Sequence, residues 1–342
     1  MFLQVHHHQS LLRAARIIWR HAVRYRRLLP VASFAAGLAS FFLVERQAQL
    51  AQWLTAFLLL GWIWLIGEGL FGRLLSRWLR PQWSEAATRL AAQSLHQETL
   101  FFTLPFFLAT TTWASGQVLF TGTLMLAAAA SIVDPIYLGV IASRRWLFLG
   151  FHAFTLFVAL LTALPIMLQL TTGESLGLAT LAMMIFALPG VAGVLDVRRT
   201  RRWLTMGLLT LALGGFAWTT RGWIPPATLR VTDAAITFRV TEPQRIHGEH
   251  RPLVDAGRLA EGLYAFTAIR APRGLHQPVI HEWRHEGQLV DRIEIDIVGG
   301  REQGYRAWSH KTEFPPKPYG DWQVVVRTDD GQLIGVLRFR VV

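Results

Sequence analysis

The feature of this sequence that most limits its fold is a series of long apolar runs in the first two thirds of the chain. A helix needs about 20 residues to cross the apolar core of a bilayer. Seven runs reach or approach that length: 29–45, 51–72, 99–116, 118–141, 146–170, 176–195 and 203–219. They predict an α-helical polytopic membrane bundle with seven spans, formed by residues 29–219.

Arginines fall between these runs in a regular pattern. The chain holds 18 Arg and 7 acidic residues before Pro225-Pro226, and the remainder is nearly neutral. The clusters lie before the first run and after the second, fourth and sixth runs, so seven spans would place them all on one side. The positive-inside rule makes that side cytoplasmic. We therefore expect a bacterial inner-membrane protein with a cytoplasmic N-terminus and an extracytoplasmic C-terminus, and no nucleic-acid partner.

Residues 1–28 form a basic segment with an amphipathic pattern. Its position before the first run predicts that it lies in the cytoplasm along the inner leaflet. We expect it to contact anionic lipids there through arginines at helical spacing: Arg13, Arg16, Arg20, Arg24 and Arg27. The chain has no Cys, which excludes disulfides and Cys-ligated metals.

From residue 229 onward the period changes from helical to alternating. Short alternating stretches are separated by turn signals such as Asp329-Asp330-Gly331. This pattern predicts a separate all-β, immunoglobulin-like sandwich over 229–342, placed in the periplasm and joined by a linker at 220–228. The alternating stretches are Ala234–Val240, Leu263–Ile269, Ile293–Ile297, Trp322–Val326 and Leu337–Val341.

The segment His281-Glu282-Trp283-Arg284-His285 matches the H-E-x-x-H pattern of zinc metalloproteases. That chemistry requires a helix, in which two histidines four apart reach one metal. Here the segment alternates, and Gly287 follows it as a turn signal. In a strand the two histidines lie about 13 Å apart, too far to share one zinc. We expect a strand and hairpin and no metal site.

The C-terminal region also resembles a known family. The pieces that carry the resemblance are His281 with Trp283, the segment Trp308-Ser309-His310-Lys311, and Gly320-Asp321-Trp322. They are similar to a family of extracytoplasmic all-β domains, of unknown function, that end bacterial membrane proteins. The resemblance covers about residues 230–342. It implies an uncharacterised multi-pass inner-membrane protein and supplies no catalytic residue.

Aromatic and polar side chains in this region are candidates for binding. Pro315, Pro316 and Pro318 stiffen a loop that is flanked by aromatic residues. Such aromatics could stack on a sugar or contact a protein, and the alternative is a structural loop with a core tryptophan. The candidate binding residues are His281, Trp283, Trp308, Lys311, Tyr319 and Trp322.

Three ionisable residues fall within the predicted spans: Glu68, Asp134 and His152. Charged groups are costly in hydrocarbon, so each is a candidate for function. They could form a proton-linked or cation site open to the cytoplasm. The structural alternative is that Asp134, which precedes Pro135, bonds backbone groups at a helix kink.

Two functions remain open from the sequence. In the first, the sandwich binds an envelope partner, either protein or glycan, and the helices anchor it or carry a signal. In the alternative, the helices transport or handle a small or lipid-linked substrate with Asp134 as the functional carboxylate. No nucleophile with its base is recognisable, so we name no catalytic residue and expect no cofactor.

Overall fold

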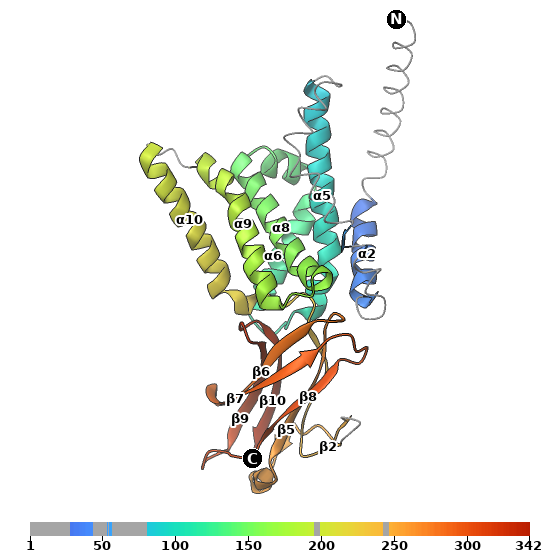
Figure 1. Cartoon of the computed structure of the whole chain (residues 1–342), viewed down its shortest axis with the longest axis vertical. Coiled ribbons are helices and arrows are strands. Elements are labelled where there is room, and N and C mark those ends of the chain that lie inside the picture. Colours follow the sequence, from blue (N-terminus) through green and yellow to red (C-terminus); the bar gives the residue numbers. More distant parts are fainter. Residues whose placement is uncertain (1–27, 44–52, 54, 57–80, 195–198, 242–245) are drawn as a thin grey trace, which may run out of the picture.

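The computed structural model describes residues 28–43, 53, 55–56, 81–194, 199–241 and 246–342. Helices lie side by side in one part of the molecule, and a β-rich domain lies at one end of them (Figure 1). Except for Leu28, the predicted basic segment 1–28 with its five arginines falls outside the described residues. Glu68 falls outside them as well.

The helical part consists of helices of unequal length. Neighbours α5, α8, α9 and α10 contact one another in turn, and α2 packs on α5. The elements are α2 (Leu29–Leu43), α5 (Pro81–Thr110), α6 (Gln117–Ile132), α7 (Asp134–Ile136), a π-helix (Tyr137–Ile141), α8 (Arg145–Met167), α9 (Thr172–Val194), α10 (Arg199–Thr219) and a 3-10 turn (Arg221–Trp223).

The predicted polytopic bundle of seven spans is wrong. Among the described residues, one helix, α8, is long and apolar enough to cross a membrane. A second span exists only if Gln117–Ile132 and Asp134–Ile141 count as one, although they are bent by 94°.

The error has a physical cause. A membrane span needs an uninterrupted helix of about 20 residues, and an apolar run in the sequence does not guarantee one. The run 118–141 is broken before Asp134, and the run 51–72 lies almost wholly outside the described residues. The shorter apolar helices are Pro30–Ala39, Thr172–Leu188 and Trp203–Thr219.

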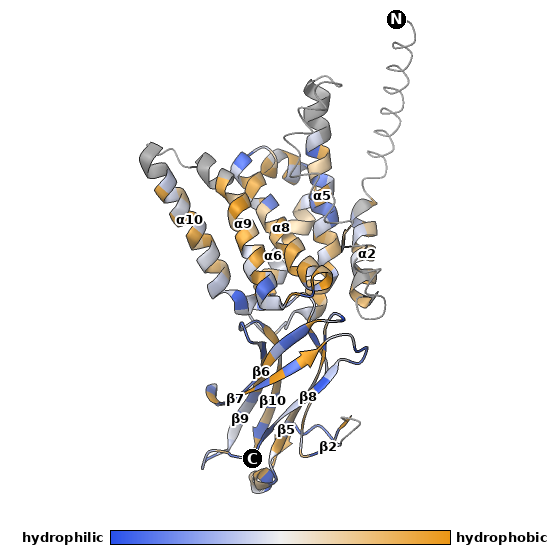
Figure 2. Ribbon diagram, viewed as in Figure 1, coloured by the Kyte–Doolittle hydropathy of each residue, from blue (hydrophilic) through white to orange (hydrophobic). Residues whose placement is uncertain are grey.

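Apolar side chains fill the interior of the helical part and also cover its outside. Phe106 and Phe107 are fully buried. A Cβ at Gly37 of α2 would overlap the carbonyl of Phe102 on α5, so glycine allows these helices to approach closely. On the outside, Leu126 and Leu204 are each 73% exposed. Apolar residues dominate α6, α8 and α9 (Figure 2), and such an outer surface requires an apolar partner.

The β-rich domain consists of two main sheets. One has the strand order β1-β5-β8, the other β4-β10-β9-β6-β7, and β2 and β3 form a small third sheet. β4 pairs with β10 in parallel, and the other strand pairs are antiparallel. The domain is β-rich as expected, and its immunoglobulin-like arrangement stays a prediction. The strands are β1 (Arg230–Thr237), β2 (Val240–Thr241), β3 (Ile246–His247), β4 (Leu253–Val254), β5 (Leu263–Arg270), β6 (His276–His285), β7 (Gln288–Val298), β8 (Tyr305–Lys311), β9 (Gly320–Thr328) and β10 (Leu333–Val341).

Four of the five alternating stretches lie within single strands as predicted, whereas Ala234–Val240 contains the end of β1 and the start of β2. Inward residues of the strands make one core. Trp283 and Trp322 are fully buried between the sheets together with Phe339. The hairpin predicted after His285 is confirmed, because β6 and β7 pair through a turn at Glu286-Gly287. Both turn residues have positive φ, 48° and 79°, as a tight two-residue hairpin requires.

The helices and the β-rich domain meet in a closely packed junction. Residues 224–228, predicted to belong to a linker, are buried there. Gln277 of β6 accepts hydrogen bonds from the backbone N–H of Thr172 (2.9 Å) and from its hydroxyl (3.2 Å). Gln117 of α6 donates to the carbonyl of Leu333 (2.7 Å). The connection is therefore a packed interface.

The burial of Trp283 generates a first prediction. Its indole N–H donates to Ser309 Oγ (3.0 Å), and its ring packs edge-on against Phe339. We expect Trp283→Ala to lower the free energy of unfolding of the β-rich domain by about 3–5 kcal/mol through loss of packing. Urea unfolding of the purified full chain, followed by circular dichroism, measures the change. Tyr319→Ala removes an aromatic ring that is 62% exposed and should change little. Equal stabilities of the two variants would contradict this account.

Candidate functional site

The first candidate site begins at a break in the helix that follows α6. Val133 is extended (φ −90°, ψ 96°), so α6 ends at Ile132 and α7 starts at Asp134 in a new direction. Pro135 has no N–H, so the helical hydrogen bond to the carbonyl of Ser131 cannot form. The chain then continues as a π-helix, Tyr137–Ile141, a distortion often found at functional sites.

Two glutamines of α5 bond the carbonyl that the proline leaves unpaired. Gln97 Nε2 donates to the carbonyl of Ser131 (2.7 Å), and Gln93 Nε2 donates to it as well (3.1 Å). Gln93 Nε2 also lies 3.0 Å from Asp134 Oδ1, to which it donates. The carboxylate is thus held at the break, and glutamines satisfy the main chain.

A chain of buried aromatic groups extends from the same break. His96 of α5 lies four residues before Leu100 and directly beside Gln97. Its Nδ1 lies 2.8 Å from the hydroxyl of Tyr137, and its Nε2 lies 3.1 Å from Nδ1 of His152 on α8. All three side chains are buried. If Tyr137 donates to His96, the other ring nitrogen of His96 carries the proton that is donated to His152.

We name these residues the helix-break cluster: Gln93, His96, Gln97, Ser131, Asp134, Tyr137 and His152. A cavity of about 600 Å³ lies beside it, between α2, α5 and the break. Gln97 and Asp134 form its polar end. The rest of the lining is mainly apolar: Pro30, Val31, Phe34, Phe101, Leu104 and Ile132. The cavity therefore has one hydrogen-bonding end and one hydrocarbon-like wall.

The structure brings Asp134 and His152 to neighbouring parts of one cluster, as joint function would require. Sequence reasoning missed Gln93, His96, Gln97 and Tyr137. The first three fell between the predicted spans 51–72 and 99–116, whereas α5 already starts at Pro81. Their spacing of three and four residues, which puts them on one helical face, was the available signal.

The candidate residues of the β-rich domain lie mostly in its interior. His281, Trp283 and Trp322 are buried, and so is Lys311, which forms an ion pair with Asp291 (3.0 Å). Because the alternation of the strands turns these four side chains inward, little of them is available on the surface to a binding partner. Trp308 is half-buried. Tyr319 remains exposed.

His281 and Trp283 are joined through one hydroxyl. Ser309 Oγ accepts from the indole of Trp283 and lies 3.0 Å from His281 Nδ1. The Ser309 hydroxyl can then donate to Nδ1, which leaves the proton of His281 on Nε2, 3.2 Å from Thr267 Oγ1. The H-E-x-x-H segment is a strand, as predicted. Within the described part of the chain, no three His, Asp or Glu side chains gather as a metal would require.

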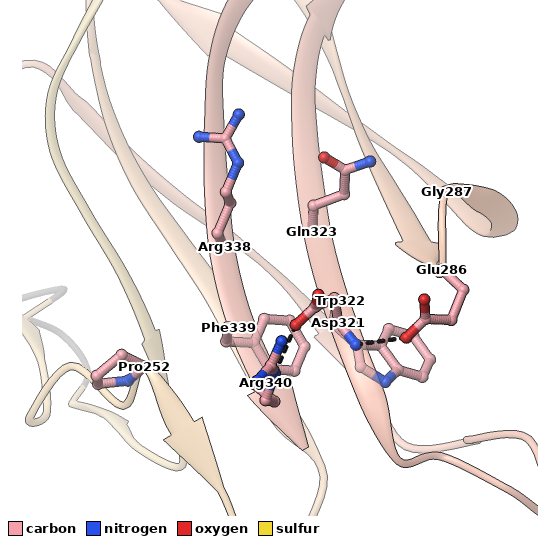
Figure 3. A pocket seen from close by; sticks show the side chains of 9 residues that line it. All are labelled: Pro252, Glu286, Gly287, Asp321, Trp322, Gln323, Arg338, Phe339 and Arg340. Carbon is pink, nitrogen blue, oxygen red and sulfur yellow. Dashed lines mark hydrogen bonds and ion pairs between the residues drawn. The ribbon is translucent and has the colours of Figure 1, made fainter. Parts of the chain in front are cut away.

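An open groove of about 470 Å³ lies at the end of the larger sheet that is farther from the helices. Figure 3 shows Trp322 and Phe339 beside charged side chains of both signs. Asp321 pairs with Arg340 (2.6 Å), and Glu286 Oε1 accepts from the N–H of Asp321 (2.7 Å). The two acids thus already have partners.

Comparison with protein families gives two matches. A family of unknown function, DUF5924, matches residues 8–265. The chain belongs to the DUF5924 family. A protein family of unknown function, DUF2914, matches residues 276–341, which bears out in part the resemblance seen in the C-terminal sequence. No curated protein and no solved structure matches the chain.

The border between the two matches falls inside the β-rich domain. The DUF5924 match ends within β5, and the DUF2914 match begins with β6. Ala265 of β5 and Val279 of β6 nevertheless lie in one core. This DUF5924 protein therefore builds its β-rich domain from both matched regions. Neither family description states a membrane, a ligand or a reaction.

The interior position of His281 generates a prediction about pH. Burial lowers the pKa of this side chain to about 4. In the unfolded chain it titrates near 6.5, so between these values the unfolded state binds the extra proton. Stability is fully present above about pH 6.5 and is lost as the pH falls toward 4. We expect a loss of about 2 kcal/mol between pH 7 and pH 5 from this one group.

Urea unfolding at the two pH values tests this expectation. His281→Asn lacks the titrating ring, while the other histidines remain in both proteins. Between pH 7 and pH 5, the free energy of unfolding of the variant should fall by about 2 kcal/mol less than that of the wild type. An unchanged difference between pH 7 and pH 5 would contradict the assignment.

Proposed function

We propose that the helical part binds an amphipathic molecule in the cavity beside the helix-break cluster. The observation that carries the proposal is that one cavity is lined by a carboxylate and by mainly apolar side chains. Asp134 and Gln97 are at one end of the cavity, and Phe34, Phe101 and Leu104 lie along it. A ligand with a polar head and a hydrocarbon chain matches both ends.

The groups at the polar end favour a head that donates hydrogen bonds. Asp134 contributes carboxylate oxygens to the lining of the cavity. The glutamine N–H groups are already directed to Ser131 and Asp134. An ammonium or hydroxyl head complements such acceptors, whereas a second carboxylate would be repelled.

The lipid environment of this site is part of the proposal. Exposed apolar side chains on α6 and α10 support contact with lipid, with α8 as the crossing helix. Arg144 precedes α8, which begins at Arg145, and α10 begins at Arg199; these ends point away from the β-rich domain (Figure 1). By the positive-inside rule we place that side in the cytoplasm and the β-rich domain in the periplasm of a bacterial inner membrane.

This proposal ranks handling of a lipid-like substrate above capture of an envelope partner. The aromatic residues suggested for capture are mostly buried. If the β-rich domain binds a protein or glycan, the groove of Figure 3 is its most accessible recess. Asp321 and Glu286 already have partners in the groove. The cavity combines Asp134 and Gln97 with a mainly apolar lining, which suits an amphipathic ligand.

The role of Asp134 can be tested by binding. We expect the purified full chain to bind a dansyl-labelled long-chain alkylamine, and Asp134→Asn to bind it about tenfold more weakly because the ion pair with the ammonium head is lost. Dansyl fluorescence measures binding. The same label on a chain with a neutral ether head should bind weakly to both proteins. Asp296→Asn, at an exposed position on β7, is the matched control. Equal binding by Asp134→Asn and the control would refute the proposal.

The side of the membrane can be tested with reporter fusions. Alkaline phosphatase, which requires the periplasm for activity, should be active when it is fused after Val342. A green fluorescent protein fused at the same place should stay dark. Fusions after Ser143, at the opposite ends of the helices, should show the reverse. A fluorescent C-terminal fusion with inactive phosphatase would overturn the orientation.

A further inference from the structure

A second recess lies where the larger sheet meets the end of α10. It has a volume of about 380 Å³ and is lined by four guanidinium groups. We call it the arginine hollow and define it by Arg221, Arg284, Arg292 and Arg327 together with Glu282. It differs from the groove of Figure 3, which lies at the other end of the sheet.

The sheet register gathers these side chains on its outer face. Glu282 and Arg284 are on β6, and Arg327 of β9 lies opposite Ile280, the residue two before Glu282. Arg292 of β7 lies opposite Glu282. In a strand, residues two apart point to the same face, so neighbouring strands place these charges side by side.

Positive charge exceeds the negative charge that faces it. One carboxylate, Glu282, bonds both Arg284 (2.7 Å) and Arg327 (3.4 Å). Arg221 donates to the backbone carbonyls of Trp218 and Asp330. Arg292 is exposed at the edge of the sheet. The lining as a whole has four arginines and three acids, Glu282, Asp329 and Asp330, so its formal net charge is +1.

Asp329 and Asp330 also line the recess, and both have neighbours at the junction with the helices. Asp329 Oδ1 accepts a hydrogen bond from Gln277 Nε2 (3.0 Å) in the junction. The carboxylate of Asp330 packs directly on Gly173 at the start of α9, where a Cβ would collide with it. A helix N-terminus favours such a negative charge. These aspartates thus serve the junction with the helices.

The arginine hollow lies beside the end of an exposed apolar helix surface. α10 carries exposed Leu208, Leu211 and Phe216, and it ends at Thr219, immediately before Arg221. Trp218 and Trp223 flank this end and are 45% and 49% exposed. Half-exposed tryptophans beside arginine, at the limit of an apolar surface, are typical of the level at which lipid head groups lie.

We propose that the arginine hollow binds a phosphate group carried by the head group of an anionic lipid. Guanidinium groups present paired N–H donors that match phosphate oxygens, and several of them compensate a full negative charge. The hollow would then fix the β-rich domain against the membrane surface. This inference does not depend on the amphiphile cavity, which contains a carboxylate and lies at the helix break.

The experiment titrates the full chain in neutral detergent with three probes. They are short-chain phosphatidylglycerol, short-chain phosphatidylcholine and inorganic phosphate, and microscale thermophoresis measures binding. Arg292→Gln removes one charge at an exposed edge position. Arg338→Gln removes the same charge from an exposed position on β10, outside the hollow. The arginines of the N-terminal segment are common to all three proteins.

We expect Arg292→Gln to bind phosphatidylglycerol about fivefold more weakly, as the loss of one partly exposed ion contact implies, and Arg338→Gln to bind like the wild type. Phosphatidylcholine, whose phosphate is neutralised by choline, should bind weakly to all. If millimolar inorganic phosphate displaces the lipid, the hollow also accepts free phosphate. If it does not, the bound phosphate group comes from the lipid. Equal affinities of the two variants for phosphatidylglycerol would overturn the proposal.

Discussion

Buried side-chain amides bond the main-chain groups that the ends of helices and strands leave unpaired, and both candidate sites depend on these bonds. Gln93 and Gln97 bond the carbonyl of Ser131, which Pro135 deprives of its helical partner. Gln277 bonds the first N–H of α9, one of the groups that a helix cannot satisfy internally. An amide can donate and accept at once, which suits it to places where a helix and a strand meet.

This arrangement explains why polar residues occur in an apolar interior. A buried main-chain carbonyl without a partner costs about 1–3 kcal/mol, so a break such as the one before Asp134 needs a side chain that bonds it. The same bonds fix nearby groups. Because Gln93 also holds Asp134, the carboxylate is directed to the cavity rim. Because Gln277 also holds Asp329, one acid of the arginine hollow is withdrawn into the junction.

The sequence was sufficient to predict the strands, because alternation depends only on neighbouring residues along the chain. It identified His281–His285 as a strand and placed a turn at Glu286-Gly287, both of which are confirmed. It also gave a helix kink at Asp134, before Pro135, as the structural alternative, and the chain does bend there. The predicted number of membrane spans was wrong, because hydropathy is averaged over a run of residues and does not show where a helix ends.

The remaining features could not be predicted, because they depend on residues that are distant in the sequence. His96 meets Tyr137 and His152 only when α5 and α8 pack together. The arginine hollow combines Arg221 with residues of three strands, whose register the sequence does not define. Periodicity predicts which face of one element is buried. It does not identify the element that packs against that face.

One helix, α6, connects the junction with the β-rich domain to the helix break. α6 has 16 residues, so it spans about 24 Å from Gln117 to Ile132. At its start, Gln117 bonds the carbonyl of Leu333 in the β-rich domain, and Thr111 and Thr121 bond each other between α5 and α6 (2.6 Å). At its end lies the break with Asp134. Because the junction is hydrogen-bonded and buried on both sides, the β-rich domain cannot turn without displacing the start of α6. The cavity and the arginine hollow therefore belong to one mechanical unit, and a group that fixes the β-rich domain at the membrane surface also fixes the helix that ends at the cavity.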